Sequence, residues 1–367
     1  MFEIEKTFDD PGITAYPSLG DPGKVLFFDI ETTGLSPYGS ALYLVGAQYF
    51  KDGKWHFRQW FSESLSDEIP VLQAFSAFLG NFGTLVHYNG DTFDIPYLTA
   101  LYEQYHLDVP FGAMNSVDIL KCARRVRALL QPDSLRQKHI EKALGIRRDD
   151  AYTGAELIEV YRQWQTGKPD SLLKDLLLHN EEDVRCLPKI LPLLSFDEVL
   201  TGRTLPESLH AEKDPENERL VLRAEYPFSF PQKRSVDVSE QGSRVFFREN
   251  TATLTVPFVH TELKKYLPNP KQYFYLLRED MIIPRELGSG VDPKNRVPAR
   301  KDTCYVRLTD DFVPAISGFP EEVFRKDLLD KSRWLRLKDL DLNAYFQSFL
   351  QSILTLKAGN GIEKSNR

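Results

Sequence analysis

The sequence is poor in the features that mark secreted, membrane-spanning and zinc-binding proteins. Its 367 residues include only three cysteines, Cys122, Cys186 and Cys304, which lie far apart and outside any CxxC or Cys/His pattern. Isolated cysteines in an odd number argue against a disulfide framework and against structural zinc. No run approaches the roughly 20 apolar residues that a membrane-spanning helix needs, and the acidic start, MFEIEKTFDD, lacks the apolar segment of a signal peptide. We therefore expect a soluble, cytoplasmic protein with no membrane partner.

A surplus of positive charge is also missing. The 46 Lys and Arg residues are outnumbered by 53 Asp and Glu residues, which gives a net charge of −7. This balance argues against a protein that coats DNA without specificity, although it is compatible with an enzyme that has a local basic groove. Basic side chains do concentrate between Lys121 and Arg148, where nine of them accompany only Asp133 and Glu141.

The remaining composition favours two folded parts. Apolar residues make up 42% of the chain, with 24 Phe and 16 Tyr, which is ample material for buried cores. The length exceeds that of one typical domain. A polar stretch that contains Gly202 and Pro215 interrupts the pattern of elements. We therefore expect a first domain at 20–197, a linker at 198–219 and a second region at 220–357.

The first domain has the element order of an α/β fold. Asp52-Gly53 is a strong hairpin signal, because both positions tolerate a positive φ. Pro96 suits the first turn of a helix, where a missing N–H costs nothing. The expected elements are strands at 25–31, 41–50 and 54–61, a helix at 67–79, a strand at 84–88, a helix at 95–105, a strand at 115–119 and helices from there to about 193.

The second region favours strands more than helices. A helix is expected only at 335–356, so this region reads as a β-rich α+β fold with no assigned role. The strand-like runs are RLVLRAEY (219–226), RVFFREN (244–250), ATLTVPFV (252–259) and QYFYLL (272–277).

Two carboxylates stand on the first expected strand, in the run Asp29-Ile30-Glu31-Thr32-Thr33-Gly34. Side chains alternate across a strand, so Asp29 and Glu31 face the same side, about 7 Å apart. Such a pair repels itself unless a cation lies beside it, and oxygen ligands suit a hard divalent metal. The alternative is a surface strand with two solvated acids.

Two further motifs follow along the chain. Asp94 comes where a strand gives way to a helix, a position typical of sites in open α/β sheets, although it also suits a helix N-cap. His179 and Asp183 stand four residues apart in a helical stretch and therefore share one face. A surface ion pair is the alternative for these two. Nearby His87 and Asp118 are interpreted as a hydrogen-bonded core residue and a helix cap, and Phe93 as a core residue.

Taken together, the three motifs resemble those of the DEDD (DnaQ-like) 3′→5′ exonuclease superfamily. Residues 116–164 are also similar to the YprB-like, ribonuclease-H-like bacterial proteins, most clearly at QKHIEKALGI (137–146), at Asp149-Asp150 and at TGAELIEVY (153–161). The resemblance covers roughly 24–195. It implies a ribonuclease-H-like mixed sheet of five strands that is flanked by helices.

The resemblance also implies a site and its cofactors. Asp29, Glu31, Asp94 and Asp183 would hold two Mg²⁺ or Mn²⁺ ions, with Asp29 bridging both. His179 would orient the attacking water or accept its proton. In the known exonucleases a His usually stands five positions before the last Asp and a Tyr stands four before it, so His179 occupies the usual Tyr position. The residues expected to bind substrate are Thr32, Thr33, Leu35, Asn89, Lys121, Arg124 and Arg125.

The expected function is therefore a two-metal-ion 3′→5′ exonuclease that releases nucleoside 5′-monophosphates from the 3′ ends of single-stranded DNA or RNA. Two alternatives stay open. One is a non-catalytic nucleic-acid-binding scaffold, and the other is a structure-specific endonuclease with the same metal site. Sequence also leaves open the choice between DNA and RNA, the protein partners, the oligomeric state and the role of residues 220–367.

Overall fold

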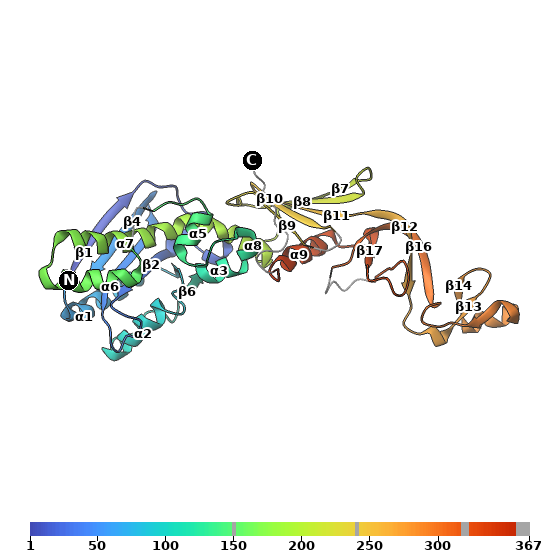
Figure 1. Cartoon of the computed structure of the whole chain (residues 1–367), viewed down its shortest axis with the longest axis horizontal. Helices are drawn as coiled ribbons and strands as arrows, with labels where there is room; N and C mark the ends of the chain where they lie inside the picture. The colour runs from blue at the N-terminus through green and yellow to red at the C-terminus, as the bar shows by residue number, and fades with distance from the viewer. Residues whose placement is uncertain (149–151, 239–241, 317–322, 357–367) are drawn as a thin grey trace. The chain divides into compact units, whose positions relative to one another are not determined.

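The computed structural model describes residues 1–148, 152–238, 242–316 and 323–356. The chain divides into two compact units. Unit 1 comprises Met1–Thr204 and Phe228–Gln232, and unit 2 comprises Leu205–Pro227 and Lys233–Leu356. Figure 1 shows the elements of both units with their labels. Each unit is described by itself below.

Unit 1 is built on a mixed sheet of six strands in the order β1-β4-β3-β2-β5-β6. β2 pairs antiparallel with β3 and parallel with β5, and β6 continues the parallel side. The carboxyl ends of β2, β5 and β6 therefore lie at one edge of the sheet, where open α/β sheets place their sites. The strands are β1 (Phe2–Phe8), β2 (Val25–Thr32), β3 (Leu42–Lys51), β4 (Lys54–Phe61), β5 (Thr84–His87) and β6 (Asn115–Asp118).

The expected fold class is confirmed, with one strand more than the five that were expected. β1 pairs antiparallel with β4 along its whole length, from Phe2 opposite Phe61 to Phe8 opposite Trp55. The acidic residues of this segment do not predict a strand. As an edge strand it is held mainly by backbone hydrogen bonds to one neighbour, so its composition carries a weak signal.

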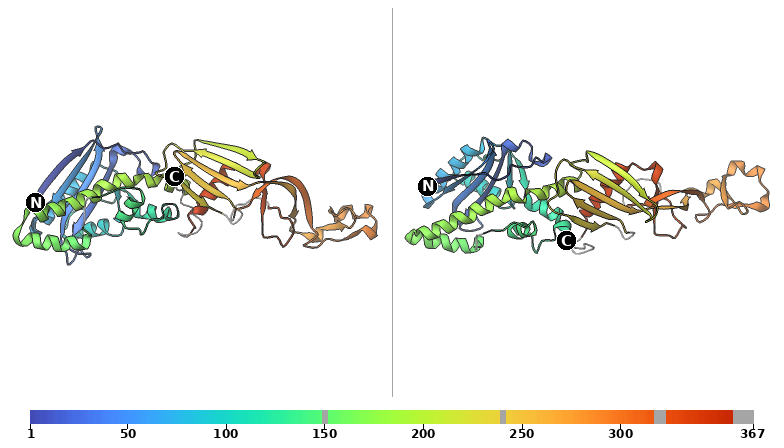
Figure 2. Two further views of the ribbon diagram at one scale, coloured as in Figure 1. Left: turned by 45° about the horizontal axis from the view of Figure 1, so that its top comes forward. Right: turned by 90° about the horizontal axis from the view of Figure 1, so that it is seen from above.

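Helices cover both faces of this sheet, and the residues of β2 alternate between them. Phe28 and Ile30 join a core with α1 (Glu68–Leu79) and α2 (Asp94–Gln104). The opposite face carries α6 (Gly154–Gly167) and α7 (Asp170–Ile190), and α7 runs across β2 and β3 (Figure 2). The remaining helices of unit 1 are α3 (Ile119–Arg125), α4 (Arg127–Leu130), α5 (Gln137–Ala143) and α8 (Leu194–Leu200).

Unit 2 contains three antiparallel sheets and a helix that buries its apolar side chains, α9 (Leu342–Ile353). The largest sheet has the order β7-β8-β11-β10-β9. The segment expected to be a linker, 198–219, holds the end of α8 and all of β7, an edge strand whose polar side chains resemble those of a loop. The strands of this sheet are β7 (Ser208–Asp214), β8 (Arg219–Glu225), β9 (Arg234–Asp237), β10 (Arg244–Arg248) and β11 (Thr251–Pro257).

The two smaller sheets of unit 2 have the orders β12-β16-β17 and β14-β13-β15. Their strands are β12 (Val259–Tyr266), β13 (Tyr273–Leu276), β14 (Met281–Pro284), β15 (Arg296–Pro298), β16 (Tyr305–Pro314) and β17 (Trp334–Arg336). The three cysteines are free and buried, as their spacing predicts. In the part of the chain that the structure describes, no helix has the length and apolar character needed to cross a membrane.

Candidate active site

Asp29 and Glu31 lie near the carboxyl end of β2 and face α7, as the alternation of a strand predicts. The Asn180 side chain of α7 lies 3.2 Å from Asp29 Oδ2, and His179 Nε2 lies 3.7 Å from Glu31 Oε1. Glu31 is only 8% exposed, and the central position of β2 in the sheet gives both carboxylates a rigid base.

Asp94 joins this pair from the next parallel strand. It is the first residue of α2, and the turn after β5 brings its side chain back to β2. The backbone N–H of Ile30 donates to Asp94 Oδ1 at 3.2 Å. Because Ile30 stands between Asp29 and Glu31, this hydrogen bond places the third carboxylate beside the first two. The N-cap position of α2 is Phe93, so Asp94 is the first residue inside the helix and not its N-cap.

His179 and Asp183 complete the group from one face of α7. His179 Nε2 lies 3.1 Å from Asp183 Oδ2. Ligand atoms of Glu31, His179 and Asp183 all lie within 4.8 Å of one another, a spacing that suits a metal ion. We call the four acids with His179 the carboxylate site. Three separate motifs in the sequence thus meet at one place in unit 1.

The acids of the carboxylate site lie close enough together to repel one another when they are ionised. Burial raises the pKa of Asp29 well above its usual range, and the nearby charges of Asp94, Asp183 and Glu31 add to the rise. Burial likewise raises the pKa of Asp94 to about 7. Burial also acts to raise the pKa of Asp183, but the hydrogen bond from His179 and the charge of Arg148 outweigh it and lower the pKa. A divalent cation would relieve this repulsion, so the donor set fits such an ion.

Asn180 is a residue of the site that the sequence analysis missed. Its Nδ2 donates to Asp29 Oδ2, and its Oδ1 accepts from Gln59 Nε2 at 3.0 Å. Asn180 and Gln59 are fully buried. Gly46 stands opposite Asp29 on β3, and a Cβ added there would lie 2.0 Å from Asn180 Oδ1. α7 therefore approaches the sheet closely only because residue 46 is glycine. Adjacency to His179 was the only sequence signal.

Arg148 is the second residue that was missed. It donates to Asp183 Oδ1 through Nη1, while Nε and Nη2 donate to the two carboxylate oxygens of Glu141. The Arg148 side chain is 6% exposed and that of Glu141 is 1% exposed. Glu141 thus fixes a guanidinium against a predicted metal ligand. Asp149 and Asp150, the next residues of this family-like run, lie outside the described residues.

The predicted substrate residues near β2 take different positions. Thr32 Oγ1 donates to the Gly34 carbonyl at 2.8 Å, and Thr33 Oγ1 accepts from the Ala41 N–H at 2.8 Å. Leu35 is 86% exposed and is therefore available to a ligand. These three assignments stay predictions.

Asn89, the fourth residue of this set, follows β5 with a φ of 68°, a conformation that Asn tolerates better than most residues. Its backbone N–H donates to Asp118 Oδ1, and its side-chain Oδ1 accepts from Thr92. Phe93 packs against the core of unit 1, as expected.

The three basic residues of α3 differ in their partners. Lys121 Nζ lies 2.5 Å from Asp91 Oδ2, and Arg124 is exposed. Arg125 donates two hydrogen bonds to the buried Asp197, from Nε at 2.5 Å and from Nη2 at 2.7 Å. A phosphate would have to compete with that carboxylate for Arg125. Arg124 is therefore the best placed of the three for a phosphate contact.

A second group of possible metal ligands lies at the same edge of the sheet. His87, Asp91 and Asp118, here the His87 cluster, also bring ligand atoms within 4.8 Å of one another. Its carboxylates already accept hydrogen bonds from the protein. Asp118 Oδ1 accepts from two backbone N–H groups, and Asp91 accepts from Ser116 and Lys121. His87 is buried, with hydrogen bonds to Ser116 and to the Gly90 N–H. The core role of His87 and the cap role of Asp118 match the sequence-based interpretation.

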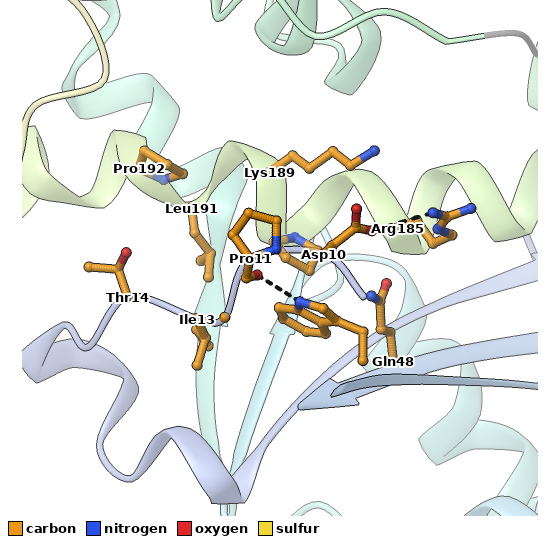
Figure 3. A pocket seen from close by; sticks show the side chains of 12 residues that line it. Asp10, Pro11, Ile13, Thr14, Gln48, Arg185, Lys189, Leu191 and Pro192 are labelled. Carbon is orange, nitrogen blue, oxygen red and sulfur yellow. Dashed lines mark hydrogen bonds and ion pairs between the residues drawn. The ribbon is translucent and has the colours of Figure 1, made fainter. Parts of the chain in front are cut away.

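Unit 1 also holds a pocket that contains none of the predicted ligands (Figure 3). It lies between the segment after β1 and the last turns of α7. Arg185 borders it and pairs with Asp10 at 3.4 Å, and the Trp55 indole N–H donates to the Pro11 carbonyl at 2.8 Å. Gln48 points into the pocket from β3. We assign no substrate group to this pocket.

Comparison with known proteins defines the class of unit 1. Residues 26–195 match the RNase_H superfamily, which is the segment that carries all four acids and His179. The match concerns this segment, which is a little less than half of the chain. The chain is also similar to the uncharacterized protein YprB of Bacillus subtilis (strain 168), with 30% identity over 194 residues. The expected YprB-like, ribonuclease-H-like family is thereby confirmed. The match covers 52% of this chain and only 45% of YprB.

Solved structures show weaker similarity. The family B DNA polymerase from the hyperthermophilic archaeon Pyrobaculum calidifontis aligns with a TM-score of 0.41 and 13% identity, over 90% of this chain and 45% of the polymerase. Exonuclease I aligns with a TM-score of 0.34 and 14% identity, over 55% of each chain. Similarity at this level does not establish an activity for this chain.

Proposed function

We propose that this chain is a metal-dependent 3′→5′ exonuclease of the DEDD type, which releases nucleoside 5′-monophosphates from single-stranded DNA or RNA. The observation that carries the proposal is the convergence of four acids and His179 from β2, α2 and α7. The match of residues 26–195 to the RNase_H superfamily supports it.

Asp29, Glu31, Asp94 and Asp183 would hold the metal ions, Mg²⁺ or Mn²⁺. The chemistry that such ions supply is activation of a water and stabilisation of the departing oxygen. The raised pKa values of Asp29 and Asp94 support this assignment, because they mark acids that gain most from a nearby cation. Asn180 would keep the Asp29 carboxylate oriented through its side-chain contact.

His179 would orient the attacking water or accept its proton. Its Nε2 lies near both Glu31 and Asp183, at 3.7 and 3.1 Å from a carboxylate oxygen of each, so the ring is within reach of a water held by these acids. The one-turn spacing to Asp183 places both side chains on the same helix face.

Digestion of 5′-labelled single-stranded DNA and RNA with Mg²⁺, with Mn²⁺ and with EDTA tests the proposal. We expect a metal-dependent ladder that shortens from the 3′ end and disappears in Asp183→Asn. Asp175→Asn is the matched control: it makes the same change on the same helix about two turns earlier, outside the site.

Three other results would contradict the exonuclease proposal. Cleavage of a circular single strand would point to an endonuclease with the same metal site. Cleavage that survives Asp183→Asn would exclude the carboxylate site as its source. No cleavage by a folded, metal-loaded protein would point to the nucleic-acid-binding scaffold.

A further inference from the structure

A small three-stranded sheet is inserted between the two strands of a long antiparallel ribbon in unit 2. β12 pairs along its whole length with β16, and the register ends at Tyr266 opposite Tyr305. The chain between them forms β14-β13-β15, which we call the tip sheet (residues 270–301). Figure 1 draws β13 and β14 beyond the ends of β12 and β16.

The tip sheet has almost no core of its own. Of residues 270–301, all of which the structure describes, only Leu276, Gly288, Asn295 and Ala299 are buried. Large apolar side chains stand exposed instead: Leu277 is 53% exposed, Met281 49% and Leu287 62%. A cluster of exposed apolar groups on a small module is typical of a surface that binds something.

The charge of the tip sheet opposes that of the chain. Seven basic residues accompany four acids, for a net charge of +3 in a protein of net charge −7. Among the described residues, none of the seven basic side chains makes an ion pair within 4.0 Å. The seven are Lys271, Arg278, Arg285, Lys294, Arg296, Arg300 and Lys301.

The acids of the tip sheet are mostly occupied by other partners. Asp280 pairs with Arg307 of β16 at 2.9 Å and accepts from two tyrosine hydroxyls. Glu279 accepts from the Asn295 amide at 2.7 Å, and Asp292 caps the short helical turn after it. The positive charge of the surface is therefore not neutralised locally.

Two of the cations are organised around an aromatic ring. The guanidinium groups of Arg285 and Arg296 lie 5.0 and 5.1 Å from the centre of the Phe274 ring. A Cβ at Gly288 would lie 2.6 Å from that ring and 2.9 Å from Arg296, so only glycine permits this packing. The stacked arrangement holds the two charges in place while Arg285 stays exposed.

We propose that the tip sheet binds the sugar–phosphate backbone of single-stranded nucleic acid, with its aromatic and apolar side chains contacting bases. Unneutralised cations interleaved with aromatics are the arrangement that tracks a single strand. A protein partner fits less well at the exposed Lys271, Lys294 and Lys301, because Lys is depleted from protein interfaces, whereas the four Arg residues and Met281 suit either kind of partner. The inference rests on the proposed function, for which it supplies a second contact with substrate.

Binding of a fluorescein-labelled single strand to the full chain in EDTA tests this surface separately from cleavage. The tip variant neutralises four exposed cations, Lys271→Ala, Lys294→Ala, Arg300→Ala and Lys301→Ala. The matched control carries Lys213→Ala, Arg223→Ala, Arg244→Ala and Arg248→Ala, each of which already pairs with an acid in unit 2. Both variants lose four positive charges, and they differ in where these charges lie and in whether an acid pairs with them.

We expect the tip variant to bind about tenfold or more weakly at low salt and the control to bind like the wild type. Each phosphate contact contributes about 0.7 to the logarithmic salt slope for single strands, so the slope should fall by about 3. Thermal unfolding checks that both variants fold.

Equal affinity of the two variants, or no binding by the wild type, would overturn the proposal. The exonuclease proposal fails separately. If the wild type cleaves nothing but the tip variant still binds more weakly than the wild type, the exonuclease proposal is wrong and the tip proposal holds. If instead Asp183→Asn stops cleavage and the tip variant binds like the wild type, only the proposal for the tip sheet is wrong.

Discussion

Two clusters of acids with a histidine stand at the same edge of one sheet, and they differ in how their charge is balanced. In the His87 cluster, the carboxylates accept hydrogen bonds from backbone N–H groups, Ser116 and Lys121. Burial acts to raise the pKa of Asp91, but its hydrogen bonds from Lys121 and Ser116 outweigh it and lower the pKa. In the carboxylate site, burial and neighbouring acids raise the pKa values of Asp29 and Asp94, and only at Asp183 do the hydrogen bond from His179 and the charge of Arg148 outweigh burial and lower the pKa.

The difference favours the carboxylate site over the His87 cluster as the proposed metal site. Charge that is balanced by protein donors stabilises the fold. Carboxylates that repel one another without a balancing partner lower the stability of the fold. Such groups are typical of sites that bind ligands or catalyse reactions. Ligand spacing alone does not make this distinction, because both clusters satisfy the same 4.8 Å criterion.

The largest contrast is expected in cleavage. Asp29→Asn should lower the rate by on the order of a thousandfold, about 4 kcal/mol of transition-state stabilisation. Asp118→Asn in the His87 cluster should change the rate little and should mainly weaken the cap of α3. Initial rates on a labelled single strand measure both. Comparable losses in the two variants would erase the distinction between the clusters.

The second contrast concerns pH and metal. The folded pKa of Asp94, about 7, lies above the unfolded value of about 3.9, so the metal-free protein loses stability as pH rises from 4 to 7. Metal must displace those protons. At a concentration 100 times its Kd, Mn²⁺ should therefore stabilise the protein by about 2.7 kcal/mol at pH 8 and by much less at pH 5.5. Thermal unfolding with and without Mn²⁺ checks this. Equal stabilisation at both pH values would contradict it.

The third expected effect concerns the support of Asp29. Asn180→Ala should cost about 1–3 kcal/mol of stability, because it leaves the buried Gln59 amide without its side-chain acceptor. Gly46→Ala should cost a similar amount through overpacking against Asn180. Both variants should also weaken Mn²⁺ binding, a loss that a purely structural role would not produce. Calorimetric titration of folded protein with Mn²⁺ distinguishes the two roles.

The smallest effect is expected at a paired surface residue of the His87 cluster. Asp91→Asn removes the charge from a pair with the exposed Lys121, and an amide oxygen can still accept from Ser116, so the loss of stability should be small. Urea unfolding should show a small loss at most, and Mn²⁺ affinity should not change. A large loss of metal affinity in this variant would mean that the His87 cluster also holds metal.

Sequence alone predicted the elements that local pattern controls. The hairpin at Asp52-Gly53 forms with positive φ at both residues, and Asp29 and Glu31 face one side of β2. The three motifs meet because strand order follows from element order in this class of sheet. The edge strand β1 was missed because its alternation is short and half polar.

The missed parts of the site depend on tertiary contacts. Nothing in the local sequence around Arg148 indicates that its guanidinium reaches Asp183, 35 positions away. The same holds for Gly46, whose missing side chain matters only because Asn180 lies against it. Nor does the local sequence show that Arg125, a predicted phosphate ligand, pairs with the buried Asp197, which is 72 positions away in the chain.

The most direct test of the central claim is calorimetric titration of Mn²⁺ into the wild type, Asp29→Asn and Asp91→Asn. The account predicts that the wild type and Asp91→Asn bind Mn²⁺ with the same affinity and that Asp29→Asn loses most of it. Binding that survives Asp29→Asn, or that disappears in Asp91→Asn, would contradict the assignment of the carboxylate site as the metal centre.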